Sequence, residues 1–302
     1  MPARSDDISL VVPFPPGGST DFTAQILAER LRQARGWTVK VETIIGDFGY
    51  NAVRALLAGD ANHVFLVGNI NANSVVPVIH RGLFDIEHWN VVQPVTRLAD
   101  FPSVACTYEK FPANTLKDFL SRLKQTTGLI RYGTDFLGTY VDIDVIRLAE
   151  RASLERACMT AEGAVGILEN LEAERIDFAL LNVATATANA ARLNPLAISG
   201  PHRLKDFPGV ATLSECGFAG IGTSNWQCLL ASRQAMKDRV ALLYGAVVDV
   251  MMNAETAKRF AEIGARVSVS SSPHQFEAEI EAEAAQWAQY AGRIAETPLL
   301  ER

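Results

Sequence analysis

The sequence predicts an α/β protein with two lobes, each a mostly parallel sheet flanked by helices. Strand and helix patterns alternate as β-α-β-α-β over residues 8–68, and a second alternating series begins near residue 115. Such alternation is typical of a parallel sheet that is covered by helices. The chain then returns to long helices, which indicates that it visits the first lobe twice. We therefore expect one lobe over 1–103 plus 228–302 and the other over 104–227.

The first series contains three strands and two helices. In its first helix, the residues Phe22, Ile26, Leu27 and Leu31 are spaced to form one buried face. The expected strands are 8–12, 38–45 and 63–68, and the expected helices are 22–35 and 51–60.

The second series repeats the pattern, after a stretch at 85–103 that breaks the alternation. Asn114 or Thr115 is expected to cap its first helix. The expected helices are 115–125, 140–151 and 164–174, the expected strands are 129–133, 155–159, 176–181 and 195–199, and the carboxyl-terminal part adds a strand at 226–231 and a last helix over 274–294.

The composition is that of a globular protein, with 48% hydrophobic and 21% charged residues in a chain of 302. The net charge is −6 and no run of Lys or Arg occurs, which argues against nucleic acid or an anionic membrane surface as partner. No stretch of eighteen apolar residues is present, so no transmembrane helix is expected. The amino-terminal residues lack the apolar core of a secretory signal. Two interpretations follow: a cytoplasmic chain, or a mature chain whose leader has been removed.

The four cysteines, Cys106, Cys158, Cys216 and Cys228, show no spacing typical of a metal site. They are expected to be small buried hydrophobic residues, with a single disulfide as the alternative. Phosphate-binding and catalytic motifs are also missing from the sequence. We therefore expect no metal, no cofactor and no catalytic residues.

The loop between the first strand and the first helix reads Pro15-Pro16-Gly17-Gly18, followed by Ser19-Thr20-Asp21. Proline stiffens the approach, and glycine lets a ligand come close to the backbone. Ser19, Thr20 and Asp21 are all good N-cap residues, so the helix is expected to start among them. The unpaired N–H groups of its first turn then form a site for an anionic group. A rigid connector without a ligand is the alternative.

Other loops at the carboxyl ends of strands carry polar residues that could join this site. In "RYGTDFLGTYVDID" (131–144) a strand, a turn and a helix follow one another again, with Thr139 at the N-cap position. Two such loops that face each other would hold one ligand from both sides of a cleft. The candidate ligand-binding residues are Phe14, Gly17, Gly18, Ser19, Thr20, Asp21, Asn69, Asn71, Thr134, Gly138, Thr139 and Asn182.

Acidic and aromatic residues near the two loops leave the ligand class undecided. If two of Asp21, Asp135 and Asp142 face the cleft, a ligand with an ammonium group, such as an amino acid, is favoured. In the other interpretation Asp21 caps the first helix and Asp142 is solvated on the next. A set of aromatic residues could likewise form a wall for a ring-bearing carboxylate or simply pack; these are Phe14, Phe48, Tyr50, Phe136 and Tyr140.

The stretch "VVPFPPGGSTDFTAQILAERL" (11–31) strongly resembles the amino-terminal signature of the solute-binding proteins of tripartite tricarboxylate transporters, the Bug family. The segments "IRYGTDFLGTYVDID" (130–144), "LAISGPHRLKDFPGVATLSECGF" (196–218) and "WQCLLA" (226–231) are similar to later family segments. The resemblance implies a type II periplasmic-binding fold with a carboxylate ligand in the cleft. It assigns the first ligand loop to Phe14, Gly18, Ser19, Thr20 and Asp21, and the second to Thr134, Gly138 and Thr139.

The chain departs from the family pattern in places that bear on the ligand. The family's turn after the second strand is replaced by "ETIIGDF" (42–48), and the family's histidine after the second loop is replaced near Asp142. The second loop itself carries Asp135 and Phe136 where the family has small residues. These departures point to a ligand that is unusual for the family.

Together, the residues and the resemblance predict a non-enzymatic, periplasmic solute-binding protein. It would capture a small mono- or dicarboxylate and deliver it to the membrane subunits of a tripartite transporter, and it is expected to be a monomer with its signal peptide removed. Two alternatives stay open: a cytoplasmic ligand sensor or enzyme on the same fold, and a binder of an amino acid or aromatic carboxylate.

Overall fold

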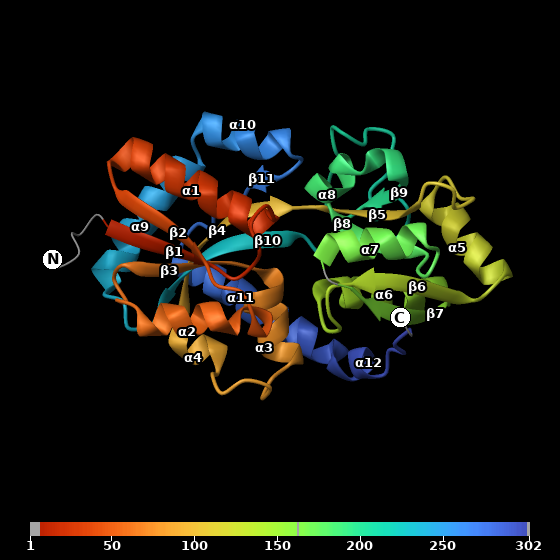
Figure 1. The fold of residues 1–302 in the computed structure, drawn as a ribbon, viewed down its shortest axis with the longest axis horizontal. Coiled ribbons are helices and arrows are strands. Elements are labelled where there is room, and N and C mark those ends of the chain that lie inside the picture. The colour runs from red at the N-terminus through yellow and green to blue at the C-terminus, as the bar shows by residue number, and fades with distance from the viewer. Residues whose placement is uncertain (1–6, 162, 301–302) are drawn as a thin grey trace. The chain divides into compact units, whose positions relative to one another are not determined.

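The computed structural model describes residues 7–161 and 163–300 and confirms the α/β class, with two sheets flanked by helices. The chain divides into two compact units (Figure 1). The first unit consists of Met1–Asp100 and Trp226–Gln286, and the second of Phe101–Asn225 and Trp287–Arg302. This division differs from the expected 1–103 plus 228–302 and 104–227 mainly at the carboxyl-terminal end.

The first unit is built on a six-stranded mixed sheet with the order β11-β4-β10-β3-β1-β2. Strands β1, β2 and β3 are parallel, whereas β10 runs antiparallel to β3. Figure 1 shows α1 on one side of this sheet and α2 on the other. The strands are β1 (Asp7–Val12), β2 (Thr38–Thr43), β3 (Val64–Asn69), β4 (Val92–Phe101), β10 (Asn225–Ser232) and β11 (Arg266–Val267). The helices are α1 (Ser19–Arg35), α2 (Tyr50–Ala58), α3 (Val76–Ile79), α4 (His88–Val91), α9 (Lys237–Met251), α10 (Ala254–Glu262) and α11 (Pro273–Trp287).

The second unit contains a five-stranded mixed sheet with the order β7-β6-β8-β5-β9. Strand β6 is parallel to both of its neighbours, and β5 is antiparallel to β8 and β9. The strands are β5 (Ser103–Tyr108), β6 (Leu129–Thr134), β7 (Glu155–Thr160), β8 (Phe178–Asn182) and β9 (Leu193–Ile198). The helices are α5 (Leu116–Gln125), α6 (Tyr140–Ala152), α7 (Gly163–Glu172), α8 (Val183–Ala188) and α12 (Ala291–Ala295).

Hydrophobic periodicity located most elements because the buried faces are those that the spacing indicates. In α1, Ile26, Leu27 and Leu31 are at most 1% exposed, and Gly36 ends the helix in the left-handed conformation with φ +69°. Helix α5 begins after Thr115, whose side chain accepts a hydrogen bond from the Asp118 N–H. The expected cap at Thr115 is therefore confirmed.

The structure adds a strand that the sequence did not predict and corrects one expected helix. The region 85–103 contains β4, a strand of ten residues that the irregular pattern of the segment concealed. The single last helix expected over 274–294 is broken, because a 3-10 turn at Ala288–Tyr290 separates α11 from α12.

The carboxyl-terminal residues belong to the second unit because they pair with its sheet edge. The backbone of Cys158 in β7 accepts a hydrogen bond from the Leu300 N–H at 2.7 Å and donates one to the Pro298 carbonyl at 2.8 Å. Arg293 of α12 forms an ion pair with Glu150 of α6 at 3.2 Å. These contacts cover an edge that would otherwise expose unpaired backbone groups.

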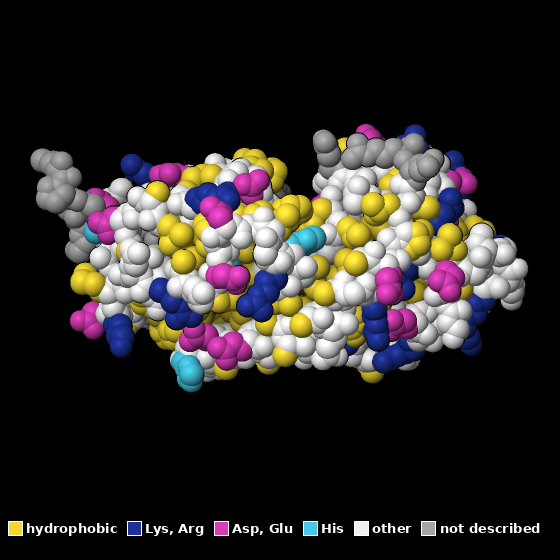
Figure 2. All heavy atoms as spheres, turned by 90° about the horizontal axis from the view of Figure 1, so that it is seen from below, with side chains coloured by type: hydrophobic (Ala, Val, Ile, Leu, Met, Phe, Trp, Pro, Cys, Tyr) yellow, Lys and Arg dark blue, Asp and Glu magenta, His cyan; other side chains and the backbone are white. Residues whose placement is uncertain are grey.

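The four cysteines carry free thiols, and Cys106, Cys158 and Cys228 are buried. Among residues 7–161 and 163–300 no group of His, Cys, Asp and Glu side chains is arranged to hold a metal ion. No single helix in that part of the chain is long and apolar enough to cross a membrane. Only α9 and α10 taken together have the required length and composition, and this pair is bent by 67°. Acidic and basic side chains are interspersed on the face in Figure 2.

The first unit encloses an unusual histidine. His88 is 2% exposed and lies edge-on to Trp89, with ring centroids 4.8 Å apart. Neither of its ring nitrogens forms a hydrogen bond with the described residues. Burial lowers the pKa of His88 to about 3, so the ring is neutral at physiological pH.

We expect His88 to make the folded state sensitive to acid. Below about pH 6.5 the unfolded imidazole binds a proton that the folded protein accepts only near pH 3, so each intervening pH unit costs about 1.4 kcal/mol of stability. Urea unfolding at pH 7 and pH 5 should show a loss of about 2 kcal/mol that His88→Phe removes. His202→Gln, at an exposed position, is the control. An equal loss in wild type and His88→Phe would contradict this account.

Candidate functional site

Three loops meet at the carboxyl ends of the parallel strands β1, β2 and β3. The contact is visible at Gly49, which follows β2: a Cβ atom there would lie 3.0 Å from the Ala72 Cβ after β3 and 3.4 Å from the Pro13 Cβ after β1. The carboxyl ends of parallel strands are where open α/β sheets bind ligands. The candidate site of the first unit is therefore a junction of three loops.

The first loop, which follows β1, leads directly into α1. Gly17 adopts φ +87°, a conformation that favours glycine, and Gly18 is the N-cap residue with φ −81° and ψ 172°. The helix begins at Ser19, within the group of capping residues at which it was expected to start, and three residues before Phe22, where hydrophobic spacing placed it. The expectation that Ser19, Thr20 or Asp21 caps the helix was wrong, because a glycine occupies the N-cap and no side chain caps the first turn.

The absence of a side-chain cap leaves backbone donors available. The Gly17 N–H donates to the Asp21 carboxylate at 2.9 Å, and the first helical hydrogen bond runs from the Phe22 N–H to the Gly18 carbonyl. Between them, the N–H groups of Gly18, Ser19 and Thr20 form no hydrogen bond with the described residues. Gly17 and Gly18 are exposed. The first turn thus holds N–H groups without an acceptor among the described residues, next to an exposed stretch of backbone, although Thr20 itself is 2% exposed.

Amide side chains from two strands support the hydroxyl groups of this first turn. The Asn69 amide of β3 donates to the Thr20 hydroxyl, and the Gln227 amide of β10 donates to the Ser19 hydroxyl, both at 3.4 Å. Asn69 is 7% exposed, and its oxygen accepts a hydrogen bond from the Ala72 N–H. The hydroxyls are therefore held in place by buried groups. Sequence reasoning named Asn69 but missed Gln227.

The remaining predicted residues of the first unit lie beside this group. Phe14 is half-buried at the start of the loop, and Asn71 is half-buried in the π-helical turn Asn71–Val75 that follows β3. The structure therefore brings the residues 17–21 together with Asn69, and it places Phe14 and Asn71 at the edges of the same group of loops.

The loop after β2 holds a strained turn. Four consecutive residues have positive φ, namely Gly46 at +119°, Asp47 at +49°, Phe48 at +55° and Gly49 at +100°. Left-handed conformations cost non-glycine residues of the order of 1 kcal/mol each. The Asp47 carboxylate accepts a hydrogen bond from Arg54 at 2.7 Å, and the Phe48 ring stacks on His80. These contacts connect the turn to Arg54 and His80.

Aromatic residues near this turn pack with one another. Phe48 and Tyr50 both contact Phe84, and the Tyr50 ring is stacked on it at a centroid distance of 3.8 Å. Tyr50 is 3% exposed, and burial raises its pKa to about 12. Both residues belong to an aromatic cluster of the first unit, which matches the packing interpretation of these two positions.

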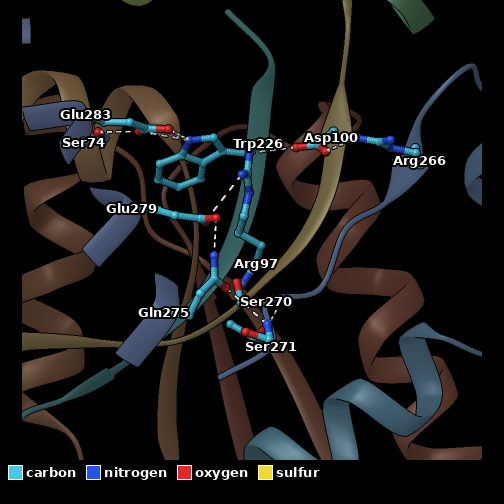
Figure 3. A network of polar contacts seen from close by, with 11 residues as sticks. Ser74, Arg97, Asp100, Trp226, Arg266, Ser270, Ser271, Gln275, Glu279 and Glu283 are labelled. Atoms are coloured by element: carbon cyan, nitrogen blue, oxygen red, sulfur yellow. Dashed lines mark hydrogen bonds and ion pairs between the residues drawn. The ribbon is translucent and has the colours of Figure 1, made fainter. Parts of the chain in front are cut away.

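A polar network that sequence reasoning missed lies behind the third loop (Figure 3). Glu283 of α11 accepts hydrogen bonds from the Ser74 hydroxyl at 3.0 Å and from the Trp226 indole at 3.2 Å. The Arg97 guanidinium lies 5.8 Å from the centre of the Trp226 ring. Burial raises the pKa of Glu283, while the Ser74 hydrogen bond and the Arg97 charge oppose that shift. The network ties the loop after β3 to α11 and β10.

The second predicted loop is closed by its own helix. Thr139 is the N-cap of α6, and its backbone N–H and hydroxyl both donate to Asp142, at 2.7 and 2.8 Å. The Gly138 N–H donates to the same carboxylate at 3.0 Å. The Thr134 hydroxyl lies 3.0 Å from the Thr139 hydroxyl. The three predicted residues are therefore brought together, around Asp142.

Asp142 itself corrects an expectation. It is not solvated, because its side chain is completely buried in a reciprocal capping box. The Tyr132 hydroxyl also donates to it, at 2.6 Å. Burial raises the pKa of Asp142, and the hydrogen bonds from Tyr132 and Thr139 oppose that shift. The sequence pattern Thr-x-x-Asp was the signal that could have revealed this arrangement.

Asn182 is the last residue of β8 and the N-cap of α8. Its side-chain oxygen accepts a hydrogen bond from the Thr185 N–H at 2.9 Å. In this position it acts as a helix cap in the second unit.

Comparison with known proteins identifies the family and the fold. A family profile described as "Tripartite tricarboxylate transporter family receptor" matches residues 21–294. The chain is 26% identical to protein BugT of Bordetella pertussis over 294 residues, which is 95% of this chain and 88% of BugT.

Solved structures share the fold. One is an R. palustris protein, Rpa4515, described with adipate, with a TM-score of 0.84, 23% identity and coverage of 97% of this chain and 98% of that one. Another is MatC from Rhodopseudomonas palustris with bound malate, with a TM-score of 0.79, 20% identity and coverage of 94% and 98%. The periplasmic binding protein BugD has a TM-score of 0.80 at 20% identity, with coverage of 97% and 99%.

The contact at Gly49 predicts that a methyl group there is costly. Gly49→Ala would place a Cβ against Ala72 in a residue with φ +100°, so we expect a loss of about 2 kcal/mol or more in urea unfolding. Gly36→Ala is the matched control, because Gly36 also has positive φ but no atom within 4 Å of its Cβ position. It should cost about 1 kcal/mol. Equal losses would mean that the three loops are not closely packed.

Proposed function

This chain belongs to the tripartite tricarboxylate transporter receptor family, whose members are substrate-binding receptors and not enzymes, and we propose on that premise that it captures a small organic carboxylate at the loop that precedes α1. The observation that carries the proposal is the set of N–H groups on Gly18, Ser19 and Thr20 that have no acceptor among the described residues.

The energetics of such a site are sufficient without a basic side chain. A hydrogen bond to a charged acceptor contributes about 1.5–3 kcal/mol, and the positive end of a helix dipole adds about 0.3–1 kcal/mol. Three such bonds approach the roughly 8 kcal/mol that corresponds to micromolar affinity. Gly18, Ser19 and Thr20 supply the backbone donors in this proposal, and Asn69 orients the Thr20 hydroxyl.

The family also indicates what happens to the bound solute. Family members are periplasmic receptors of a transporter, so we propose that this chain works in the periplasm as a monomer and delivers its ligand to the membrane subunits. Two of the similar solved structures hold adipate and malate, which are carboxylates. This supports a carboxylate as the ligand class.

The test is a calorimetric titration of the purified chain with a panel of aliphatic mono- and dicarboxylates, together with thermal unfolding. At least one carboxylate should bind with micromolar affinity and raise the unfolding temperature, since a ligand that binds only the folded state stabilises it. If none of them binds or stabilises the protein, the proposed function is wrong.

The loop itself is tested by Gly18→Val. Because Gly18 has φ −81° and only the Pro15 carbonyl within 4 Å of its Cβ position, the variant should fold normally. Its side chain would occupy the space in front of the N–H groups, and loss of two hydrogen bonds predicts affinity weaker by about 100-fold or more.

Gly209→Val is the matched control for Gly18→Val. Gly209 is an exposed glycine of the second unit with no atom within 4 Å of its Cβ position, so this variant should bind like wild type. Unchanged affinity in Gly18→Val would place the carboxylate elsewhere.

A further inference from the structure

The second unit contains a cavity that lies away from the ligand loops predicted for this unit. The cavity has a volume of about 260 Å³ and is lined by the last turn of α5, the turn after β5 and the residues between α7 and β8. It is next to Arg131, near the start of β6, and to Asp177, directly before β8. Because β6 and β8 are parallel and end at Thr134 and Asn182, the cavity lies at the opposite edge of the sheet. We call it the α5 cavity.

The walls of the α5 cavity are held in place by the protein's own contacts. In the turn after β5 the Phe111 N–H donates to the Tyr108 carbonyl at 3.0 Å, and after α5 the Gly128 N–H donates to the Leu123 carbonyl at 2.7 Å. The Phe111 ring packs on Phe119, with ring centroids 5.3 Å apart. The cavity is therefore formed before any ligand binds, as most small-molecule sites are.

The floor of the α5 cavity is apolar. Leu123, Leu171 and Ile176 line it and are at most 3% exposed. Beside them, Arg131 and Asp177 form an ion pair in which the Arg131 Nε donates to the Asp177 carboxylate at 2.9 Å. These two charges compensate each other, so the floor offers hydrophobic contact and no net charge.

The mouth of the α5 cavity carries unpaired positive charge. Lys110 and Arg122 are exposed lining residues, and neither side chain forms an ion pair or hydrogen bond with the described residues. The Lys110 Nζ lies 5.7 Å from the centre of the Tyr108 ring. The exposed carboxylate of Glu174 offsets this charge in part. The lining thus has an excess of positive charge in a chain whose net charge is −6.

We propose that the α5 cavity binds a small aromatic anion, that is, a carboxylate or sulfonate on one or two fused rings. The ring covers the apolar floor, and the anionic group accepts hydrogen bonds from Lys110 and Arg122 at the mouth. Tyr108 and Phe111 in the lining favour a flat aromatic body. The ligand is small because the cavity is below the roughly 300 Å³ at which pockets for drug-sized ligands begin.

Other classes of ligand use this cavity less well. A cation would be repelled by Lys110 and Arg122, and an uncharged ring would gain nothing from them. An inorganic anion would leave the apolar floor uncovered. All lining residues belong to the second unit and the loop before α1 belongs to the first, so this site does not depend on the proposed function.

The experiment is an NMR titration of the full, methyl-labelled chain with 2-naphthoate. The methyl resonances of Leu123, Leu171 and Ile176 should shift, because an aromatic ring lies against them, with a dissociation constant on the order of 1 mM or lower. Two partial probes, 2-naphthalenemethanol without the charge and acetate without the ring, should each bind at least about 10-fold more weakly. The same shifts are expected in Gly18→Val.

Charge variants at the mouth should change the affinity for 2-naphthoate in opposite directions. Arg122→Gln and Lys110→Gln should each weaken binding by about 3-fold or more, and together by about 10-fold or more. Glu174→Gln removes the opposing charge and should strengthen binding by about 2-fold. Lys124→Gln is the matched control, because Lys124 is exposed on the same helix as Arg122 but does not line the cavity, and it should leave the affinity unchanged.

The outcomes that overturn the inference differ from those that overturn the proposed function. Resonances of Leu123, Leu171 and Ile176 that stay in place at millimolar 2-naphthoate overturn the inference, and so does equal affinity for 2-naphthalenemethanol. Equal weakening by Lys124→Gln and Arg122→Gln overturns it too, because the effect would then be one of overall charge. Loss of the shifts in Gly18→Val assigns 2-naphthoate to the first unit and also overturns it. The proposed function stands or fails separately, by the aliphatic carboxylates and their response to Gly18→Val.

Discussion

The account depends on one constraint: a helix that begins at a glycine leaves its first N–H groups without an internal acceptor. In α1 the N-cap is Gly18, and the aspartate at the third position, Asp21, accepts a hydrogen bond from only one backbone N–H, that of Gly17. The first turn therefore keeps donors that a soluble protein would otherwise satisfy with a serine, threonine or aspartate cap. The loops after β2 and β3 meet the segment after β1 at Pro13, Gly49 and Ala72.

Helix α6 shows the opposite solution to the same constraint. Thr139 and Asp142 form a reciprocal capping box, and the glycine in front of it donates to the same carboxylate. Capping of this kind stabilises the helix, but it uses the donors that a ligand would need. The two helices therefore both begin after a glycine with positive φ, and they differ in whether side chains cap the first turn.

Much of this could be predicted from the sequence, because the decisive signals are local. Hydrophobic spacing located α1 and the strand before it, and Thr115 was identified as a cap. Strand β4 was missed because Pro94 and Arg97 interrupt its apolar pattern, although the strand lies inside the sheet. The N-cap of α1 was misassigned because three good capping residues follow the glycine that occupies the N-cap position.

Long-range contacts lay beyond sequence reasoning. Glu283 contacts Ser74 and Trp226, which are distant from it in the chain, and no spacing rule connects them. The same holds for Gln227, which reaches Ser19 from β10. Asp142 is different, because Thr-x-x-Asp is a capping signal that can be read directly. Its complete burial and its hydrogen bond with the Tyr132 hydroxyl depend on tertiary packing, which the pattern does not reveal.

The most direct test of the central claim is to observe the backbone N–H groups themselves. In a titration of the ¹⁵N-labelled chain with hexanoate, the amide resonances of Gly18, Ser19 and Thr20 should shift strongly, as expected for N–H groups that gain a charged acceptor. Those of Gly138 and Thr139 should stay in place. Shifts confined to Gly138 and Thr139, with Gly18 to Thr20 unaffected, would contradict the account.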